Sequence, residues 1–374
     1  MNTRLNNAYF NSPQSNVVLS ASHLPRVAVL SAPKERWRAK DFPESAATMN
    51  GVEAWVYAFD GDFIGYDLVT KQDVAQYDLI IANSNTTYIP RLVELAEQRS
   101  AYTRWVTLIE GDAGDYLKPL PAVQRIFEVS DLVSCINQPS LPLFQALGAG
   151  KQARVEYVGI PYPVEGVRRF AIAPEQRFDA ACKKVFLCPF LLNRWNEWLV
   201  ARRIAEDCAA MEGGMNVQYY GYVQPLSRKI RNWRELWRER SLDKRRNARR
   251  VERLYNDPQL EIRFASGLEE FFALNSQAVL WLNLDDRHTW GRYVLDAAAL
   301  GIPIITTAAT GHAEHCFPET TVPNEFALPE AFQLGKRLLS DREWYLSVSA
   351  QALDYVQAFA PAAMTKRLLA LLGW

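Results

Sequence analysis

Cysteine, net charge and long apolar runs are all scarce in this sequence, and each shortage excludes a class of protein. The 374 residues contain 42 lysines and arginines against 42 aspartates and glutamates, so no overall field draws the chain to nucleic acid or to a membrane. Five cysteines stand singly, at 135, 182, 188, 208 and 316, and none belongs to a CxxC pair. An odd number of scattered cysteines predicts reduced thiols in a cytoplasmic protein, without a disulfide framework or a zinc site.

The sequence also shows neither the pattern of a leader peptide nor that of a membrane span. The N-terminal residues contain no apolar core of the kind that a signal peptide needs, and no run approaches the length of a membrane span. Residues 1–24 are rich in asparagine and serine, and we expect them to form an N-terminal extension outside the folded core. The remaining length is more than one ordinary core would contain, which predicts two domains.

What the sequence contains is an alternation of buried-type strands with amphipathic helices. Strand patterns occur at 26–31, 51–59, 77–84, 104–109, 131–136 and 153–158, and again at 184–190, 216–222, 261–265, 278–284 and 302–307. Helical patterns separate several of these strands, which predicts an α/β fold with parallel, doubly wound sheets. The Gly- and Pro-rich stretch at 159–163 divides the alternation into two Rossmann-like halves, and we expect a first domain at 25–163 and a second at 164–358.

The stretch 278–316 carries the clearest sign of chemistry. An apolar strand is followed by a polar loop, a helix that opens near Gly291 and ends at Gly301, a second strand and a small-residue turn. This is one βαβ unit, and ligands of parallel sheets bind beyond the carboxyl ends of the strands. The positive end of the helix suits a phosphate, and Gly291 lets a ligand approach the backbone. Asp296, one to two turns into the helix, is placed to accept hydrogen bonds from a ribose diol.

The same stretch resembles the donor site of retaining GT-B glycosyltransferases of the family-4 type. That family shows two glutamates, written E-x7-E, around a Phe-Gly pair. In this sequence His288 and Asp296 stand at the glutamate positions, and Trp290-Gly291 stands where Phe-Gly is found. Further positions at the family's spacing are Gly301, Pro303, Gly311 and Glu314.

The resemblance implies the GT-B architecture, with two Rossmann-like domains beside a cleft and a final helix, 359–374, that crosses back to the first domain. It implies a nucleotide diphosphate sugar as donor substrate and no other cofactor. His288 would contact sugar hydroxyls, and Asp296 would hold the ribose. The remaining donor-site residues that it implies are Thr289, Trp290, Gly291, Arg292, Gly311 and Glu314. No cluster of metal ligands is visible in the sequence, so we expect a metal-independent site.

One loop of the first half supplies candidates for catalysis. In the resembled family, the strand that matches 104–109 often ends in a His-Asp pair near the reacting sugar. This chain has Glu110 and Asp112 there, and they are the local candidates for a base or for contacts with the acceptor. The alternative is that both are turn residues beside Gly111.

A loop of the second half supplies a candidate cation. After its first strand, the resembled family usually carries an Arg and, five residues later, a Lys for the donor pyrophosphate. Arg194 falls at the Lys position, and Pro189 stands at the Arg position. An arginine fork from Arg194 suits a phosphate, and Arg292 would supply the missing second charge.

Two basic stretches bear on the acceptor and leave its identity open. The loop 32–40 carries four cations that would face an acidic acceptor or the donor phosphates, unless it is only a solvated loop. The segment 225–257 is strongly helical and very basic, and predicts an inserted helical hairpin. The hairpin would either pack a tryptophan stripe on its domain or bind an acidic or lipid-linked acceptor at the inner face of a membrane. Nucleic acid is the least favoured partner.

These features predict a glycosyltransferase that moves a hexosyl or related group from a nucleotide diphosphate sugar to an unidentified acceptor, with retention. Three alternatives stay open: a GT-B protein that binds a nucleotide or sugar without catalysis, a nucleotide-sugar epimerase of the same architecture, and an interaction module that uses the basic segment. The changes at His288, Asp296 and Pro189 motivate the first alternative. We expect the protein in the cytoplasm.

Overall fold

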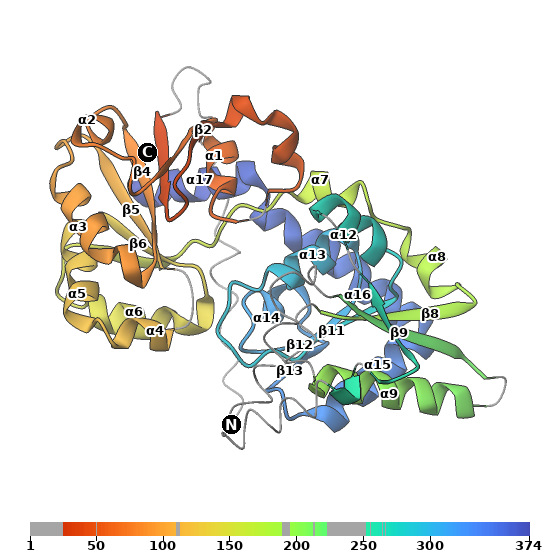
Figure 1. The fold of residues 1–374 in the computed structure, drawn as a ribbon. Helices are drawn as coiled ribbons and strands as arrows, with labels where there is room; N and C mark the ends of the chain where they lie inside the picture. Colours follow the sequence, from red (N-terminus) through yellow and green to blue (C-terminus); the bar gives the residue numbers. More distant parts are fainter. Residues whose placement is uncertain are drawn as a thin grey trace.

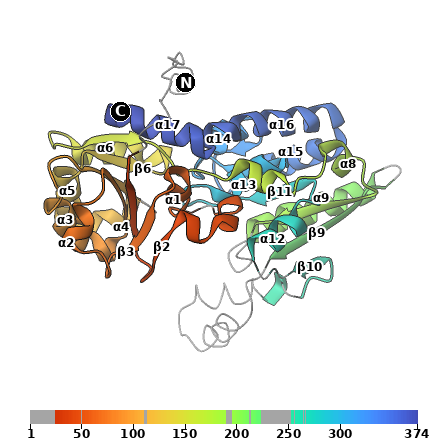
Figure 2. The same cartoon turned by 90° about the horizontal axis from the view of Figure 1, so that it is seen from above.

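The computed structural model describes residues 25–49, 51–109, 113–188, 195–211, 214–222, 252–254, 256–263, 265 and 267–374. These residues form two lobes, each built on one β-sheet with helices packed against it (Figure 1). Seen from above, the last two long helices follow one another and together extend from the second lobe to the first (Figure 2). They are α16 (Arg342–Tyr355) and α17 (Pro361–Leu372).

The described part of the first domain contains a seven-stranded sheet in the order β2-β3-β1-β4-β5-β6-β7. All neighbours are parallel except β2, which pairs antiparallel with β3 at the sheet edge. Every residue of β1, β4 and β6 is buried, because helices cover both faces of a parallel sheet. The strands are β1 (Val27–Ser31), β2 (Arg36–Arg38), β3 (Asp62–Gly65), β4 (Leu79–Ser84), β5 (Arg104–Ile109), β6 (Leu132–Cys135) and β7 (Arg154–Tyr157).

Helices connect these strands, and short 3-10 turns precede several of them. The α-helices are α1 (Ala54–Phe59), α2 (Lys71–Val74), α3 (Ile89–Glu97), α4 (Ala113–Leu117), α5 (Leu120–Val129) and α6 (Leu141–Gly148). The 3-10 turns are η2 (Ala39–Asp41), η3 (Pro43–Ala47), η4 (Thr86–Tyr88) and η5 (Gln138–Ser140).

The second domain contains, in its described part, a six-stranded parallel sheet in the order β10-β9-β8-β11-β12-β13. Counted from the first strand of this domain, the order is 3-2-1-4-5-6, which is that of a dinucleotide-binding Rossmann domain. The order reverses between β8 and β11, and ligands of such sheets bind beyond the carboxyl ends of the strands at this point. The strands are β8 (Cys182–Leu187), β9 (Asn216–Tyr222), β10 (Leu260–Arg263), β11 (Leu280–Asn283), β12 (Ile304–Thr307) and β13 (Thr321–Val322).

The helices of the second domain follow the same alternation. They are α7 (Val164–Arg168), α8 (Pro174–Phe178), α9 (Trp195–Ala210), α12 (Leu268–Asn275), α13 (Arg292–Leu300), α14 (Ala313–Cys316) and α15 (Leu328–Ser340), followed by α16, η7 (Val356–Phe359) and α17. Across the described residues, no helix combines the length and the apolarity that a bilayer crossing requires.

The expected α/β fold with two parallel Rossmann-like sheets is confirmed, but two segments differ from their predictions. The stretch 51–59, predicted as a strand, contains helix α1 over its residues 54–59. Its large buried side chains, Val52, Trp55, Val56 and Phe59, are spaced at i, i+3, i+4 and i+7, which is the helical period that the strand prediction overlooked.

The basic loop at 32–40 is also different, because part of it pairs as edge strand β2. Lys34 lies 3.0 Å from Asp67, Arg36 lies 2.8 Å from Asp73, and Arg38 lies 3.5 Å from Asp62. These three cations are therefore paired within the domain, which weakens the expectation that they meet an acidic acceptor.

One apolar cluster extends through both domains. It joins Phe63 of the first sheet to Trp281 of the second and includes Leu368 of α17. The final helix contacts α1, and the Thr365 hydroxyl donates to the Ala58 carbonyl at 3.1 Å. The C-terminal helix thus belongs to the packing of the first domain, although the chain reaches it from the second.

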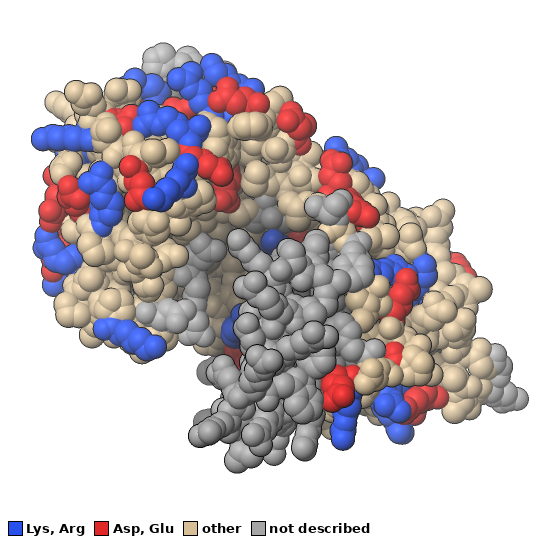
Figure 3. Space-filling view, in the orientation of Figure 1, with Lys and Arg blue, Asp and Glu red and all other residues tan. Residues whose placement is uncertain are grey.

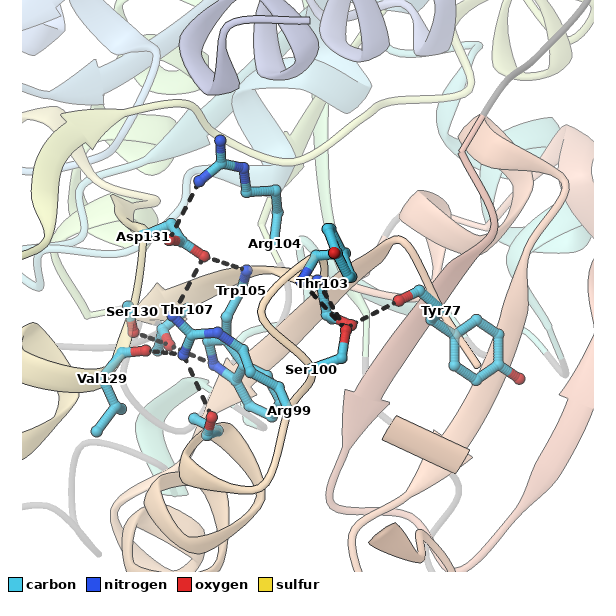
Figure 4. A network of polar contacts seen from close by, with 12 residues as sticks. Tyr77, Arg99, Ser100, Thr103, Arg104, Trp105, Thr107, Val129, Ser130 and Asp131 are labelled. Carbon is cyan, nitrogen blue, oxygen red and sulfur yellow. Dashed lines mark hydrogen bonds and ion pairs between the residues drawn. The ribbon is translucent and has the colours of Figure 1, made fainter. Parts of the chain in front are cut away.

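A polar network lies at the amino ends of β5 and β6 in the first sheet (Figure 4). The Asp131 carboxylate accepts from the backbone N–H of Trp105 at 2.7 Å, and it lies 3.4 Å from Arg99 and 3.6 Å from Arg104. Because ligands bind at the carboxyl ends of parallel strands, this network at the amino ends serves stability.

We predict that Asp131→Ala lowers the free energy of unfolding by about 2 kcal/mol, because it leaves the Trp105 N–H unsatisfied and removes two ion pairs. Asp78→Ala is the matched control: Asp78 accepts from the Arg26 N–H at 2.8 Å, but this pair is exposed, so we expect a loss under about 1 kcal/mol. Urea unfolding measures both values. Equal losses would contradict the structural role of the Asp131 network.

Candidate functional site

The candidate site lies where the loops after β11 and β12 meet. The Gly311 N–H donates to the Thr289 carbonyl at 3.0 Å and joins the two loops. Glu197 of α9 holds the start of the first loop, since its buried carboxylate accepts from the Leu284 N–H at 2.8 Å. Sequence reasoning missed Glu197, because its partner is a backbone group from a distant strand.

Gly291 is the N-cap of α13 and has a φ of 79°, in the left-handed region. A Cβ at this position would lie 1.8 Å from the Gly311 carbonyl oxygen, so no residue with a side chain fits. We expected a ligand to approach the backbone at Gly291, but the backbone of Gly311 occupies the space beside its Cα. The glycine is required by the packing of two loops, and a direct ligand contact at the same residue stays a prediction.

Asp296 lies deeper than expected. Its side chain is 0% exposed, and its carboxylate accepts from the Tyr162 hydroxyl at 2.6 Å and lies 3.7 Å from the Arg292 guanidinium. A carboxylate that held a ribose would face the crevice, whereas this one faces the segment between the domains. The reason is that α13 is buried on all sides from Val294 to Leu300, so a residue one turn into the helix points into the core.

Burial and the adjacent Asp296 carboxylate raise the pKa of Tyr162 well above its usual value. The tyrosine therefore keeps its proton and serves as the hydrogen-bond donor of the pair. Arg292, at the start of α13, is partly exposed and adds a positive charge at the end of the helix where phosphate binding is expected. Its contact with a donor phosphate stays a prediction.

The first domain reaches the site through the turn that follows β6. The Asn137 side-chain amide donates to the Thr289 carbonyl at 2.7 Å, and the Ser140 hydroxyl lies 3.3 Å from Nδ1 of His288. His288 and Thr289 are only partly buried. The structure thus brings these predicted residues to the boundary between the two domains.

The second loop contributes His312, which sequence reasoning did not select. His312 has a φ of 65°, is buried, and makes a 2.7 Å hydrogen bond between its Nδ1 and the Tyr157 hydroxyl of the first domain. Its ring lies 6.4 Å from the Trp290 ring, centroid to centroid. A non-glycine residue in the left-handed region is uncommon, but this backbone angle appears only in the structure, so the sequence carried no signal for His312. Glu314 is exposed in the first turn of α14.

Three predicted catalytic residues lie outside the described residues. They are Glu110 and Asp112, in 110–112, and Arg194, in 189–194. Most of the basic segment 225–257 also lies outside them. Their roles stay predictions. Within the part of the chain that the structure describes, no group of three or more histidine, cysteine or carboxylate side chains is arranged to hold a metal ion.

No protein-family model matches this sequence, and no curated protein matches it. Solved structures match it over nearly its whole length. HepE from Anabaena, in complex with UDP and glucose, is 12% identical with a TM-score of 0.64, covering 93% of this chain and 99% of its own. The fold is of the GT-B type.

Two synthases give the same result. The α,α-trehalose 6-phosphate synthase of Burkholderia multivorans is 10% identical with a TM-score of 0.63, covering 94% of this chain and 97% of its own. The UDP-forming α,α-trehalose-phosphate synthase of Burkholderia xenovorans, in complex with glucose-6-phosphate, is 11% identical with a TM-score of 0.59, covering 92% and 90%. At these identities the likeness establishes the GT-B fold alone.

We predict that Tyr162→Phe lowers the free energy of unfolding by about 3 kcal/mol, because it removes the donor to a buried carboxylate. Tyr66→Phe is the matched control. Tyr66 is equally buried, but its hydroxyl donates to a neutral acceptor, the Asn83 carbonyl, at 2.7 Å, so we expect about 1 kcal/mol. Chemical denaturation measures both, and a Tyr162 loss no greater than the control would show that the pair contributes no special stability.

A second prediction concerns pH. Burial, with smaller contributions from His315 and Arg367, lowers the pKa of His312 well below its usual value, and burial also lowers that of His315. As the pH falls below about 6.5, the unfolded chain therefore binds more protons than the folded one, and each such group costs up to about 1.4 kcal/mol per pH unit.

The free energy of unfolding of the wild type should consequently decrease between about pH 6.5 and pH 5. His312→Asn should show a shallower decrease, since asparagine tolerates the left-handed backbone and carries no titrating ring. His315 still titrates in the variant, so the slope is reduced and not abolished. Denaturation curves at several pH values measure it, and identical slopes would refute the assignment.

Proposed function

We propose that the protein is a glycosyltransferase that takes a sugar from a nucleotide diphosphate sugar and passes it to an acceptor held by the first domain. The observation that carries the proposal is the start of α13, which lies beyond the carboxyl end of β11 at the reversal point of the strand order and beside the first domain. HepE, of the same fold, was solved with UDP and glucose, which supports a donor of this class.

The chemistry follows from charge development. When the bond between the sugar and the diphosphate breaks, negative charge grows on the leaving diphosphate. The positive end of α13 and the Arg292 guanidinium would stabilise this charge, together with Arg194 from the segment that follows β8 in the sequence. Removing one such donor typically slows a reaction by about 100-fold or more. We propose that the reaction retains the configuration of the sugar and requires no metal ion or other cofactor.

His288 would orient the sugar. Ser140 lies beside Nδ1, at 3.3 Å, so the ring is held from the first domain. A neutral imidazole has one donor and one acceptor, whereas the glutamate of the resembled family only accepts, so the preferred sugar would differ from that of the family.

The charge pattern of the first domain does not favour a strongly charged acceptor molecule. On the face drawn in Figure 3, lysines and arginines of this domain are interleaved with aspartates and glutamates. The cations of β2 are paired with acids of the same domain. We therefore propose an acceptor recognised by shape and hydrogen bonds, with an acidic or lipid-linked acceptor requiring the basic segment 225–257.

A second candidate function is binding of a nucleotide or sugar without turnover. The burial of Asp296 favours it, because the carboxylate at the position of the second family glutamate faces Tyr162. Release of free nucleotide from a nucleotide sugar distinguishes transfer or hydrolysis from binding alone, and a new epimer of the donor would indicate an epimerase.

We predict that one nucleoside diphosphate in a panel of UDP, GDP and ADP, or its sugar, raises the melting temperature. A ligand at 100 times its Kd stabilises the folded state by about 2.7 kcal/mol. Arg292→Ala should weaken binding of that nucleotide about tenfold or more. Arg26→Ala, an exposed arginine beside the amino end of β1, should leave it unchanged. No shift with any nucleotide would oppose the proposal, as would equal affinities of the two variants.

A further inference from the structure

The turn Asn137–Ser140 of the first domain contacts the second domain at three points, two on the loop after β11 and one on α14. Asn137 donates to the Thr289 carbonyl at 2.7 Å, and Ser140 lies 3.3 Å from His288. The Gln138 side chain is hydrogen-bonded to Nε2 of His315. We call this turn, residues 137–140, the clasp.

Asn137, the first residue of the clasp, makes its main contact with the second domain. Its side chain is almost fully buried, at 1% exposure. Its Oδ1 accepts from the Ser140 N–H at 3.2 Å, and its Nδ2 donates to Thr289 across the domain boundary. The amide therefore has one orientation, since each of its two ends has a complementary partner.

The Thr289 carbonyl accepts a second hydrogen bond besides the one from Asn137. The second donor is the Gly311 N–H at 3.0 Å, so the clasp and both site loops meet at one oxygen. Thr289 lies two residues before Gly291, the N-cap of α13. A shift of this carbonyl would thus move the start of the helix at which we place the donor diphosphate.

We propose that Asn137 is a positioning residue: it holds Thr289, and through it the start of α13, in the geometry that binds the donor. The inference rests on the proposed function. Donor binding then depends on the contact between the two domains, although Asn137 itself touches no donor atom. The first domain would complete the donor site in addition to holding the acceptor.

The chain contains an internal control for this proposal. Asn85 follows β4 as Asn137 follows β6, and it caps η4 by accepting from the Thr87 N–H at 3.0 Å. Each turn leads into a helix with proline at its second residue, α3 after Asn85 and α6 after Asn137. Asn85 is exposed, whereas Asn137 is buried against the second domain. Capping therefore accounts for the asparagine in both turns, and the Nδ2 bond to Thr289 is specific to Asn137.

The experiment compares Asn137→Asp with Asn85→Asp in the full-length protein. Aspartate caps a helical turn as well as asparagine does, so both variants keep the local bond. Only Asn137→Asp replaces the Nδ2 donor with an oxygen that faces the Thr289 carbonyl. Hydrogen exchange of the backbone amides at 288–295 reports the position of the loop without ligand, and calorimetric titration with UDP reports the donor site.

We expect Asn137→Asp to exchange faster at 288–295 and to bind UDP about tenfold more weakly. Asn85→Asp should match the wild type in both measurements. A third variant, Asn137→Ala, should also weaken UDP binding without adding a repulsive oxygen; it also loses the Oδ1 bond to the Ser140 N–H, so Asn85→Ala, which loses the equivalent cap bond, is its control. If the wild type binds UDP and the Asn137 variants bind it equally well, the inference is overturned.

The two proposals fail separately. If the wild type binds neither UDP nor another nucleotide in the panel, the proposed function fails, and hydrogen exchange alone then tests the clasp. Unchanged exchange at 288–295 in Asn137→Asp overturns the positioning role whatever the nucleotide result is.

Discussion

The site depends on one backbone contact, that between Gly291 and Gly311. A Cβ on Gly291 would lie 1.8 Å from the Gly311 carbonyl oxygen, and a Cβ on Gly311 would lie 2.5 Å from the Trp290 carbonyl oxygen. The loops after β11 and β12 can therefore approach this closely only because neither residue has a side chain. This close approach determines where the start of α13 lies, and with it the Thr289 carbonyl and Arg292.

The second constraint is that the site is shared between domains. His288, His312 and His315, the histidines of the described residues, each form a hydrogen bond with a side chain of the first domain. Tyr162, in the segment between the domains, bonds Asp296 inside α13. Arg367 of α17 donates to the Tyr157 carbonyl at 2.6 Å and holds the C-terminus against the same boundary. Movement of one domain relative to the other would therefore change the site itself.

Much of the fold was predictable, because buried parallel strands are continuous apolar runs and the helices between them have a clear period. The stretches at 104–109 and 278–284 became strands as predicted. The failures have local causes. The stretch 51–59 is apolar enough for a strand, and only the spacing of its buried residues indicates a helix. Strand β2 contains Arg36 and Arg38 and forms because β3 offers an unpaired edge.

Local sequence patterns were sufficient to predict the α/β class, the division into two Rossmann-like halves and the loop that begins α13. These features depend on patterns within about 40 residues, the length of one βαβ unit. Three contacts could not be predicted in this way: Asp296 with Tyr162, the Gly311 backbone with Gly291, and Asn137 with Thr289. Each of these contacts joins residues that are far apart in the chain or on different elements, and their distance depends on how the sheets, helices and domains pack.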